Sequence, residues 1–466
     1  MKKIFQIILI LLIVYVCIYP KWFMKKIFQL DNIKLTKISE TFDKKNQSFA
    51  FLIESDQIPM GISGIKASDC GKCHQKIYNE WKQTTHAQAL EDIQFQAEIS
   101  KADNPKWLCL NCHIPLKNQR KNIVIGLKNK NILNPLFKKN LNFDKELQQE
   151  AITCAVCHLV KTKNNKAAIL GPRGSKLAPH PVVKDKVRLR GVCMRCHQPE
   201  GKSLTPNLLC WFHPKDEMIL NKEKKQDCVS CHMPLVDRKI SILSLEKKLS
   251  HSHHWVGSAI PKNFLGYNTL KNRGFKPSVS GSLRLKENII LLKIKNKNSG
   301  HHLPSGDPER YVALILSIKN KEGIITKYVS RIGQTWQWNP AKKIGDNRMI
   351  PFEERNFYIN ISQSDSFYSY EIWNVRLNAQ NATYMKESKN LDESLIKGIN
   401  HQVALLDSLY PLATLLYKED NLNEKKKVYQ ISELIQISKQ ESKIDIKDRS
   451  YANLETFKKL IEIKND

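Results

Sequence analysis

The chain has 466 residues, 41% of them hydrophobic and 26% charged, which is typical of a globular protein and excludes a disordered chain or several membrane spans. Lysine and arginine outnumber aspartate and glutamate by 75 to 45, for a formal net charge of +30. Twelve cysteines are too many for an ordinary cytosolic enzyme and too few, at this length, for disulfides to replace a hydrophobic core.

An apolar run near the N-terminus extends from Ile4 to Tyr19 and is broken only by Gln6. A spanning helix needs about 17–25 residues, whereas the apolar part of a cleaved signal has about 7–15. No Ala-x-Ala-like cleavage site follows, and Trp22 with its neighbouring lysines suits a membrane–water interface. We therefore predict an uncleaved signal anchor over residues 1–23, favoured over a cleaved signal. The protein is then single-pass in the inner membrane, with the bulk of the chain in the periplasm.

Three changes of character divide the rest of the chain. Residues 24–65 have mixed polarity and are expected to be a tether, and residues 66–260 are rich in Cys, His and Pro with short helical stretches. Residues 261–380 contain short β-rich runs separated by turn residues, typical of an antiparallel β-sandwich. Residues 381–466 return to helical periodicity and are expected to be a helical tail.

The expected strands and helices have the following bounds. The β-rich runs are Ser278–Leu285, Ile289–Lys295, Tyr311–Ile318, Ile324–Ser330, Phe357–Ile361 and Ser369–Leu377. The helical periodicity of the tail covers Asp392–Tyr417 and Leu422–Ile463.

The sequence Cys-x-x-Cys-His occurs five times and uses ten of the twelve cysteines, leaving Cys17 and Cys210. The five motifs are Cys70–Cys73–His74, Cys109–Cys112–His113, Cys154–Cys157–His158, Cys193–Cys196–His197 and Cys228–Cys231–His232. Two thiols three residues apart on one helical turn reach the two vinyl groups of one porphyrin, and the adjacent histidine binds its iron. A zinc site or a disulfide framework does not require a histidine after every second cysteine. We therefore predict five covalently bound haem c groups.

The motifs start about forty residues apart, which is too little chain for a separate hydrophobic core at each one. The porphyrins are then expected to supply much of the core and to lie close together. The predicted fold class is multidomain: a mostly α or irregular multihaem cytochrome c domain, a C-terminal antiparallel β-sandwich domain and a helical tail.

Nine further histidines are available as sixth iron ligands. They are His86, His180, His213, His251, His253, His254, His301, His302 and His401. His401 lies in the tail, far along the chain from every motif, and is expected to be an ordinary polar residue. Methionine ligation would raise the potential, but Met194 and Met233 lie too close to their own motifs to bind the same iron. We expect mainly bis-histidine haems.

Residues 70–87, with Trp81 and His86-Ala87 after the first motif, resemble the first unit of multihaem cytochromes of the cytochrome c554 and hydroxylamine-oxidoreductase-related group. The resemblance implies that His86 is a distal ligand. The Pro-His-Pro stretch before the fourth motif resembles another ligand site of that group, and implies His180.

Two later segments extend the resemblance. Cys-His-Met-Pro at 231–234, followed by His253-His254-Trp255, resembles the end of the family's haem region and implies His253 as a ligand. Gly300-His301-His302-Leu303-Pro304-Ser305-Gly306 resembles a stretch of related cytochromes that carry a β domain, and points to His301.

The chain also departs from that group. It has five motifs where the hydroxylamine oxidoreductases have eight, and it lacks the Cys-x-x-Cys-Lys that cytochrome nitrite reductases place at their catalytic haem. The fifth distal ligand stays open between His213, His251, His254 and His302. If none of them binds, one haem has an open face.

Charge and motifs together lead to two functional hypotheses. Residues 61–260 carry 33 basic and 17 acidic residues, so about half of the net charge lies on the haem-bearing segment and suits acidic redox partners. No basic module interleaved with aromatic residues is present, which argues against nucleic-acid binding. We expect a membrane-anchored electron-transfer cytochrome rather than an enzyme; the alternative is a multihaem oxidoreductase acting on a small nitrogen or sulfur compound at one open-coordination haem.

Overall fold

The computed structural model describes residues 34–101, 104–175, 177–199, 213–218, 227–257, 278–338, 340–361, 365–375 and 413–420. The predicted anchor and Cys17, Cys210 and His401 lie outside these residues. Among the described residues, no helix is both long and apolar enough to cross a membrane. The chain divides into two compact units, and the smaller one combines residues up to Asp43 with Asn122–Lys139.

The smaller unit is a three-stranded antiparallel sheet with one short helix. Its strands β1 (Leu35–Thr36), β2 (Asn122–Lys128) and β3 (Pro135–Lys139) lie in the order β1-β2-β3, and α3 is Ile38–Thr41. The turn after β2 contains two residues with positive φ, Asn129 and Lys130, at 53° and 59°. Asparagine tolerates this conformation well, so the turn and the β-branched residues of β2 together favour a hairpin.

The first part of the larger unit consists of short helices and small sheets. Its helices are η1 (Ser48–Ala50), α4 (Ala67–Gly71), α5 (Gln75–Trp81), α6 (Ile93–Ser100), α7 (Lys106–His113), η2 (Lys117–Gln119), α8 (Lys145–Gln149), α9 (Cys154–His158), α10 (Lys186–Gly191), α11 (Met194–His197), α12 (Pro214–Glu217) and α13 (Cys228–His232). Its strands are β4 (Leu159–Lys161), β5 (Ala167–Gly171), β6 (Val182–Lys184), β7 (Leu235–Arg238) and β8 (Lys248–His251). The sequence had indicated the short helices but none of these short strands, because three to five residues are too few to establish an alternating pattern.

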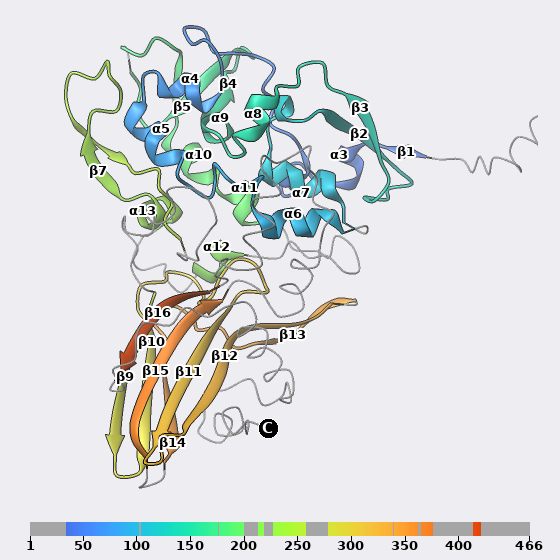
Figure 1. Ribbon diagram of the computed structural model, residues 1–466. Coiled ribbons are helices and arrows are strands. Elements are labelled where there is room, and N and C mark those ends of the chain that lie inside the picture. Colours follow the sequence, from blue (N-terminus) through green and yellow to red (C-terminus); the bar gives the residue numbers. More distant parts are fainter. Residues whose placement is uncertain are drawn as a thin grey trace, which may run out of the picture. The chain divides into compact units, whose positions relative to one another are not determined.

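The C-terminal half forms two antiparallel sheets. One has the order β14-β10-β9 and the other the order β13-β12-β11-β15-β16, with the long strands side by side in Figure 1. The strands are β9 (Val279–Lys286), β10 (Ile289–Asn296), β11 (Tyr311–Asn320), β12 (Ile325–Trp338), β13 (Ala341–Asp346), β14 (Glu354–Asn360), β15 (Asp365–Val375) and β16 (Ala413–Asp420). All six predicted β-rich runs overlap strands, which confirms the antiparallel β structure.

One hydrophobic core joins the two sheets. Alternate residues of β10, Ile290, Leu292 and Ile294, are fully buried in the same cluster as Leu314 and Leu316 of β11. This period of two is what an extended strand produces when one face is covered.

The predicted helical tail is wrong where it can be examined. Residues 413–417 belong to β16, which pairs antiparallel with the edge of β15 from Val375↔Ala413 to Ser369↔Asp420. Backbone hydrogen bonds offered by an open sheet edge outweigh a weak helical periodicity. The rest of the predicted tail lies outside the described residues.

Leu292→Ala is expected to lower the free energy of unfolding by about 2–5 kcal/mol, because a fully buried leucine leaves a cavity when it is truncated. The matched control is Leu285→Ala on the neighbouring strand β9, where the side chain is 47% exposed and the expected loss is within about 0.5 kcal/mol. Chemical denaturation followed by circular dichroism measures both. Equal losses would contradict the common core of the two sheets.

Candidate haem-binding site

Every Cys-x-x-Cys-His motif forms one tight helical turn. The second and third motifs lie within α7 and α9, and the fifth is α13. The first motif begins in the last turn of α4, and there the His74 N–H donates to the Cys70 carbonyl at 2.9 Å; in the fourth motif the His197 N–H donates to the Cys193 carbonyl at 2.9 Å. The turn places the two thiols on one side, as attachment to a single porphyrin requires.

A backbone carbonyl holds the ring of each of four motif histidines through its Nδ1 atom. The Nδ1–carbonyl pairs are His74–Ile240 (2.9 Å), His113–Ala89 (2.6 Å), His158–Leu170 (2.7 Å) and His232–Val256 (3.4 Å). A carbonyl only accepts, so Nδ1 carries a proton, and in the neutral ring Nε2 then keeps the lone pair. This is the tautomer that an iron ligand needs, with its ring orientation fixed.

All nineteen residues predicted to attach or ligate haem line one cavity of about 2490 Å³. Sites for one drug-sized ligand measure about 300–1,000 Å³, so this cavity has room for several large groups. Among the four histidines left open as the fifth ligand, His251 is also part of the lining. The donor set, thiols plus imidazoles around one common cavity, fits covalently attached haem.

Three of the predicted distal histidines face a motif histidine across this cavity. The ring centroids of His232 and His301 are 6.4 Å apart and their planes differ by 3°. Those of His158 and His253 are also 6.4 Å apart, at 28°. His86 and His197 are 6.1 Å apart, at 61°. Each pair brings together residues that are between 69 and 111 positions apart in the sequence.

The fourth predicted ligand, His180, lies close enough to His74 for the two rings to interact electrostatically. The segment that carries it packs tightly against Gly61, which has φ = +83°. A Cβ at this position would lie 1.8 Å from the Pro179 carbonyl oxygen, so only glycine permits the approach. The Nδ1 atom of His180 is buried without a hydrogen-bond partner.

The thiols of different motifs contact one another. Their sulfur atoms lie within interaction range in three pairs: Cys70 with Cys154, Cys196 with Cys112, and Cys193 with Cys228. Trp255 connects two further groups, since its ring meets that of His86 at 4.9 Å and that of His253 at 5.1 Å, both edge to face. Together these contacts link all five motifs into one cluster.

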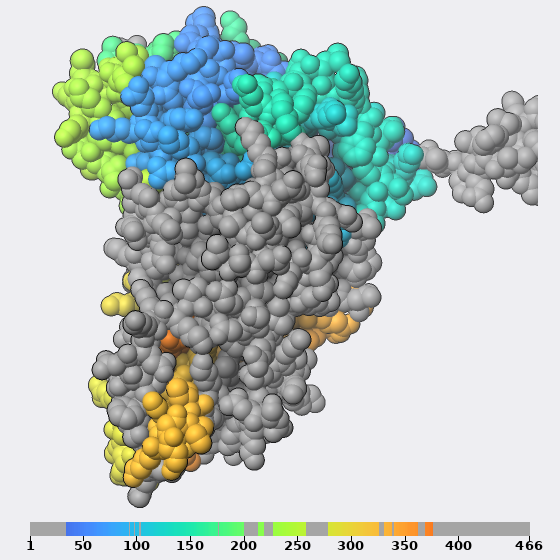
Figure 2. Space-filling model, viewed as in Figure 1, coloured from blue at the N-terminus to red at the C-terminus, as the bar shows by residue number. Residues whose placement is uncertain are grey.

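Some residues of the site were not predicted from the sequence. The Glu80 carboxylate accepts the backbone N–H of His253 at 2.8 Å and is paired with Arg238 at 2.6 Å. Arg238, which is 5% exposed, also donates to the carbonyl of His251. Figure 2 shows residues 228–256, in yellow-green, lying against residues 67–85, in blue. Glutamate and arginine 158 positions apart form no local pattern, so only the folded chain identifies this pair.

The surroundings of the buried histidine rings lower their pKa values and so determine their charge. Loss of hydration, followed by repulsion from neighbouring histidines, lowers the pKa of His86 to about 3, of His253 to about 3 and of His197 to about 4. Burial penalises the charged imidazolium because the protein interior solvates it poorly. These rings therefore stay neutral at physiological pH and keep the lone pair that binds a metal.

Residues 69–135 match the family model described as cytochrome c554 and c-prime. This confirms the resemblance predicted from the motifs, over the part of the chain that contains the first two of them. Covalently bound haem c is the cofactor of multihaem c-type cytochromes, and electron transfer is their general function.

Among solved structures, the chain is similar to a penta-heme cytochrome c552 from Thermochromatium tepidum. The two share 15% sequence identity with a TM-score of 0.48, and the match covers 76% of this chain and 98% of that one. A search of curated proteins found no match.

Proposed function

We propose that this chain is a membrane-anchored periplasmic cytochrome with five haem c groups, which transfers electrons between redox partners through closely packed, mainly bis-histidine haems. The observation that carries the proposal is the spacing of the three facing histidine pairs, at 6.1–6.4 Å between ring centroids. An imidazole binds a metal at about 2 Å, so two imidazoles on opposite sides of one iron have centroids about 6 Å apart.

The proposed ligand sets follow from these pairs. Cysteines of each motif hold the porphyrin, and the motif histidine is the proximal ligand. His301, His253 and His86 are the distal partners of His232, His158 and His197. His180 is assigned to His74 by proximity. Among the candidates for the fifth distal position we favour His251, since its ring lines the common cavity.

The contacts between motifs support passage of electrons along the cluster. Cys70–Cys154 connects the first motif to the third, and Cys193–Cys228 connects the fourth to the fifth. The second motif reaches the fourth through Cys112 and Cys196. Trp255 lies between the proposed distal ligands of the third and fourth motifs. Each haem would therefore have at least one neighbour at close range.

The charge around the haem motifs and the domain that adjoins them suggest what this part of the chain contacts. The basic excess on residues 61–260 remains positive after each haem adds its two propionates, and this favours acidic redox proteins. The two antiparallel sheets of the C-terminal half, which share one core, form the proposed β-sandwich. Through the loop that contains His301 this domain supplies one distal ligand.

Purified full-length protein is expected to give only low-spin ferric haem signals, because two imidazoles per iron produce a strong ligand field. Replacing His86, His180, His253 or His301 singly by alanine should convert about one fifth of the iron to high spin. Electron paramagnetic resonance and optical spectroscopy measure the fraction. His401→Ala is the control and should leave the spectra unchanged.

The spin state also separates this proposal from a catalytic role. A high-spin, cyanide-binding haem in the unmodified protein would overturn the pure electron-transfer proposal and favour chemistry at an open iron. A histidine whose replacement leaves every spectrum unchanged is wrongly assigned.

Membrane attachment is expected to depend on residues 1–23. The full chain should sediment with inner membranes and require detergent for release, because its apolar segment stays in the bilayer. Replacing residues 1–23 by a cleavable secretory signal should release a soluble periplasmic protein with the same haem content, measured by fractionation and haem assay. A soluble, N-terminally processed wild-type protein would contradict the anchor.

A further inference from the structure

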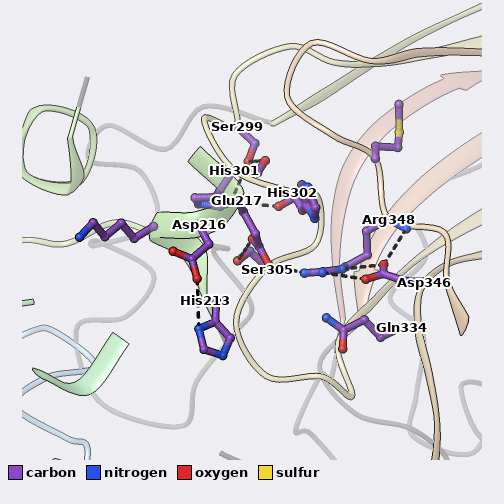
Figure 3. A network of polar contacts seen from close by, with 12 residues as sticks. His213, Asp216, Glu217, Ser299, His301, His302, Ser305, Gln334, Asp346 and Arg348 are labelled. Carbon is purple, nitrogen blue, oxygen red and sulfur yellow. Dashed lines mark hydrogen bonds and ion pairs between the residues drawn. The ribbon is translucent and has the colours of Figure 1, made fainter. Parts of the chain in front are cut away.

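A group of ion pairs centred on the buried Glu217–Arg348 pair connects α12 to the loop that contains His301 and to the segment after β13. The Glu217 carboxylate accepts the hydroxyl of Ser305 at 2.6 Å and forms an ion pair with Arg348 (Figure 3). The Glu217 and Arg348 side chains are each 8% exposed. Asp346 holds the other edge of the Arg348 guanidinium, with both N–O distances at 2.9 Å. Arg348 is therefore fixed between two carboxylates from different parts of the chain.

Each ion of this group stays charged because its oppositely charged partners offset the cost of burying it. Burial alone would lower the pKa of Arg348, but hydrogen bonds and attraction from Asp346 and Glu217 raise it above its ordinary value. Burial would raise the pKa of Asp346, but Arg348 holds it below its ordinary value. A buried ion left without its partner is strongly destabilising, so removal of either charge should loosen the contact.

The residues that Glu217 contacts are connected to His301 along the chain and by backbone hydrogen bonds. Ser305 lies four residues after His301 on one loop. The loop is tied to the strand segment beside Arg348 by two backbone hydrogen bonds between Leu303 and Met349, at 2.8 and 3.0 Å. Glu217 thus contacts two segments beside His301: the loop itself, through Ser305, and the segment that follows β13, through Arg348.

The His301 ring itself is oriented from within the loop. Its Nδ1 atom lies 2.9 Å from the His302 carbonyl and 3.0 Å from the Ser299 hydroxyl, which leaves Nε2 for a metal. These contacts set the rotation of the ring but not the distance of the loop from His232. Gln94 of α6 gives the loop one further, longer contact, at 3.3 Å to Asp307.

We propose that Glu217 is a positioning residue that holds the His301 loop at the distance at which His301 completes the coordination of the haem attached at Cys228 and Cys231. The inference rests on the proposed function, in which His301 is the distal partner of His232. Coordination of this one haem then depends on a contact between the haem-bearing segment and the β structure, so movement of one against the other would change its ligand field and potential.

The test uses Glu217→Gln in the full-length protein, because glutamine keeps the size of the side chain and removes its charge. High-spin iron should rise, to at most one fifth of the total, or one low-spin signal should shift. The midpoint potential of the same haem should change while the other four are retained. Arg348→Lys, which keeps the charge but loses the planar contact with two carboxylates, should act in the same direction.

The matched control is Glu354→Gln. Glu354 of β14 also pairs with basic side chains, Lys293 at 2.8 Å and Lys295 at 3.8 Å, but these partners lie on β10, the neighbouring strand of the same sheet. This variant should leave all five haem signals and potentials unchanged. If it alters the spectra as much as Glu217→Gln does, general loosening of the β structure explains the effect and the positioning role is overturned.

Two further variants keep the test decisive. If Glu217→Gln does not fold, Ser305→Ala removes only the hydroxyl that donates to Glu217 and should produce a smaller shift of the same signal. Unchanged spectra and potentials in the folded variants overturn the positioning role, provided that His301→Ala converts one haem from low spin to high spin. If His301→Ala itself changes nothing, the proposed ligation is wrong rather than the role of Glu217.

Discussion

The hydrogen bond between a motif histidine and a distant backbone carbonyl is the interaction on which the haem-bearing segment depends. Each motif fixes its own thiols locally, but a histidine ring attached to a short helix is free to rotate until something holds Nδ1. The acceptors for His74 and His113, the carbonyls of Ile240 and Ala89, are 166 and 24 positions away. Long connections that fold back over the motifs therefore serve to orient imidazoles.

Two glutamate–arginine pairs, each with a buried guanidinium, have parallel roles beside proposed distal ligands. Glu80 and Arg238 hold the backbone around His253, and Glu217 and Arg348 hold the structure around His301. In both cases the carboxylate and the guanidinium come from segments far apart in the chain. A buried pair contributes little net stability but penalises arrangements that separate its charges, and this suits a site in which ligand distance matters.

The short secondary structure of the haem-bearing segment follows from the same requirement. Its described helices have at most eight residues, a length at which a helix in isolation is marginal. They are held by contacts with other segments, such as the Trp81 indole N–H that donates to the Ile152 carbonyl at 2.8 Å. The C-terminal sheets differ, since strands of up to fourteen residues share a continuous apolar core.

The sequence by itself determined the five Cys-x-x-Cys-His motifs and the antiparallel strands, because motif spacing and the period of two are local properties. It pointed to His86, His180, His253 and His301 as distal ligands by resemblance alone, without saying which motif histidine each one faces. Tertiary structure decided the facing pairs, the roles of Glu80, Glu217 and Trp255, and the strand β16 where the sequence favoured a helix. These features depend on contacts between residues far apart in the chain, whose free energy is gained only when the segments meet.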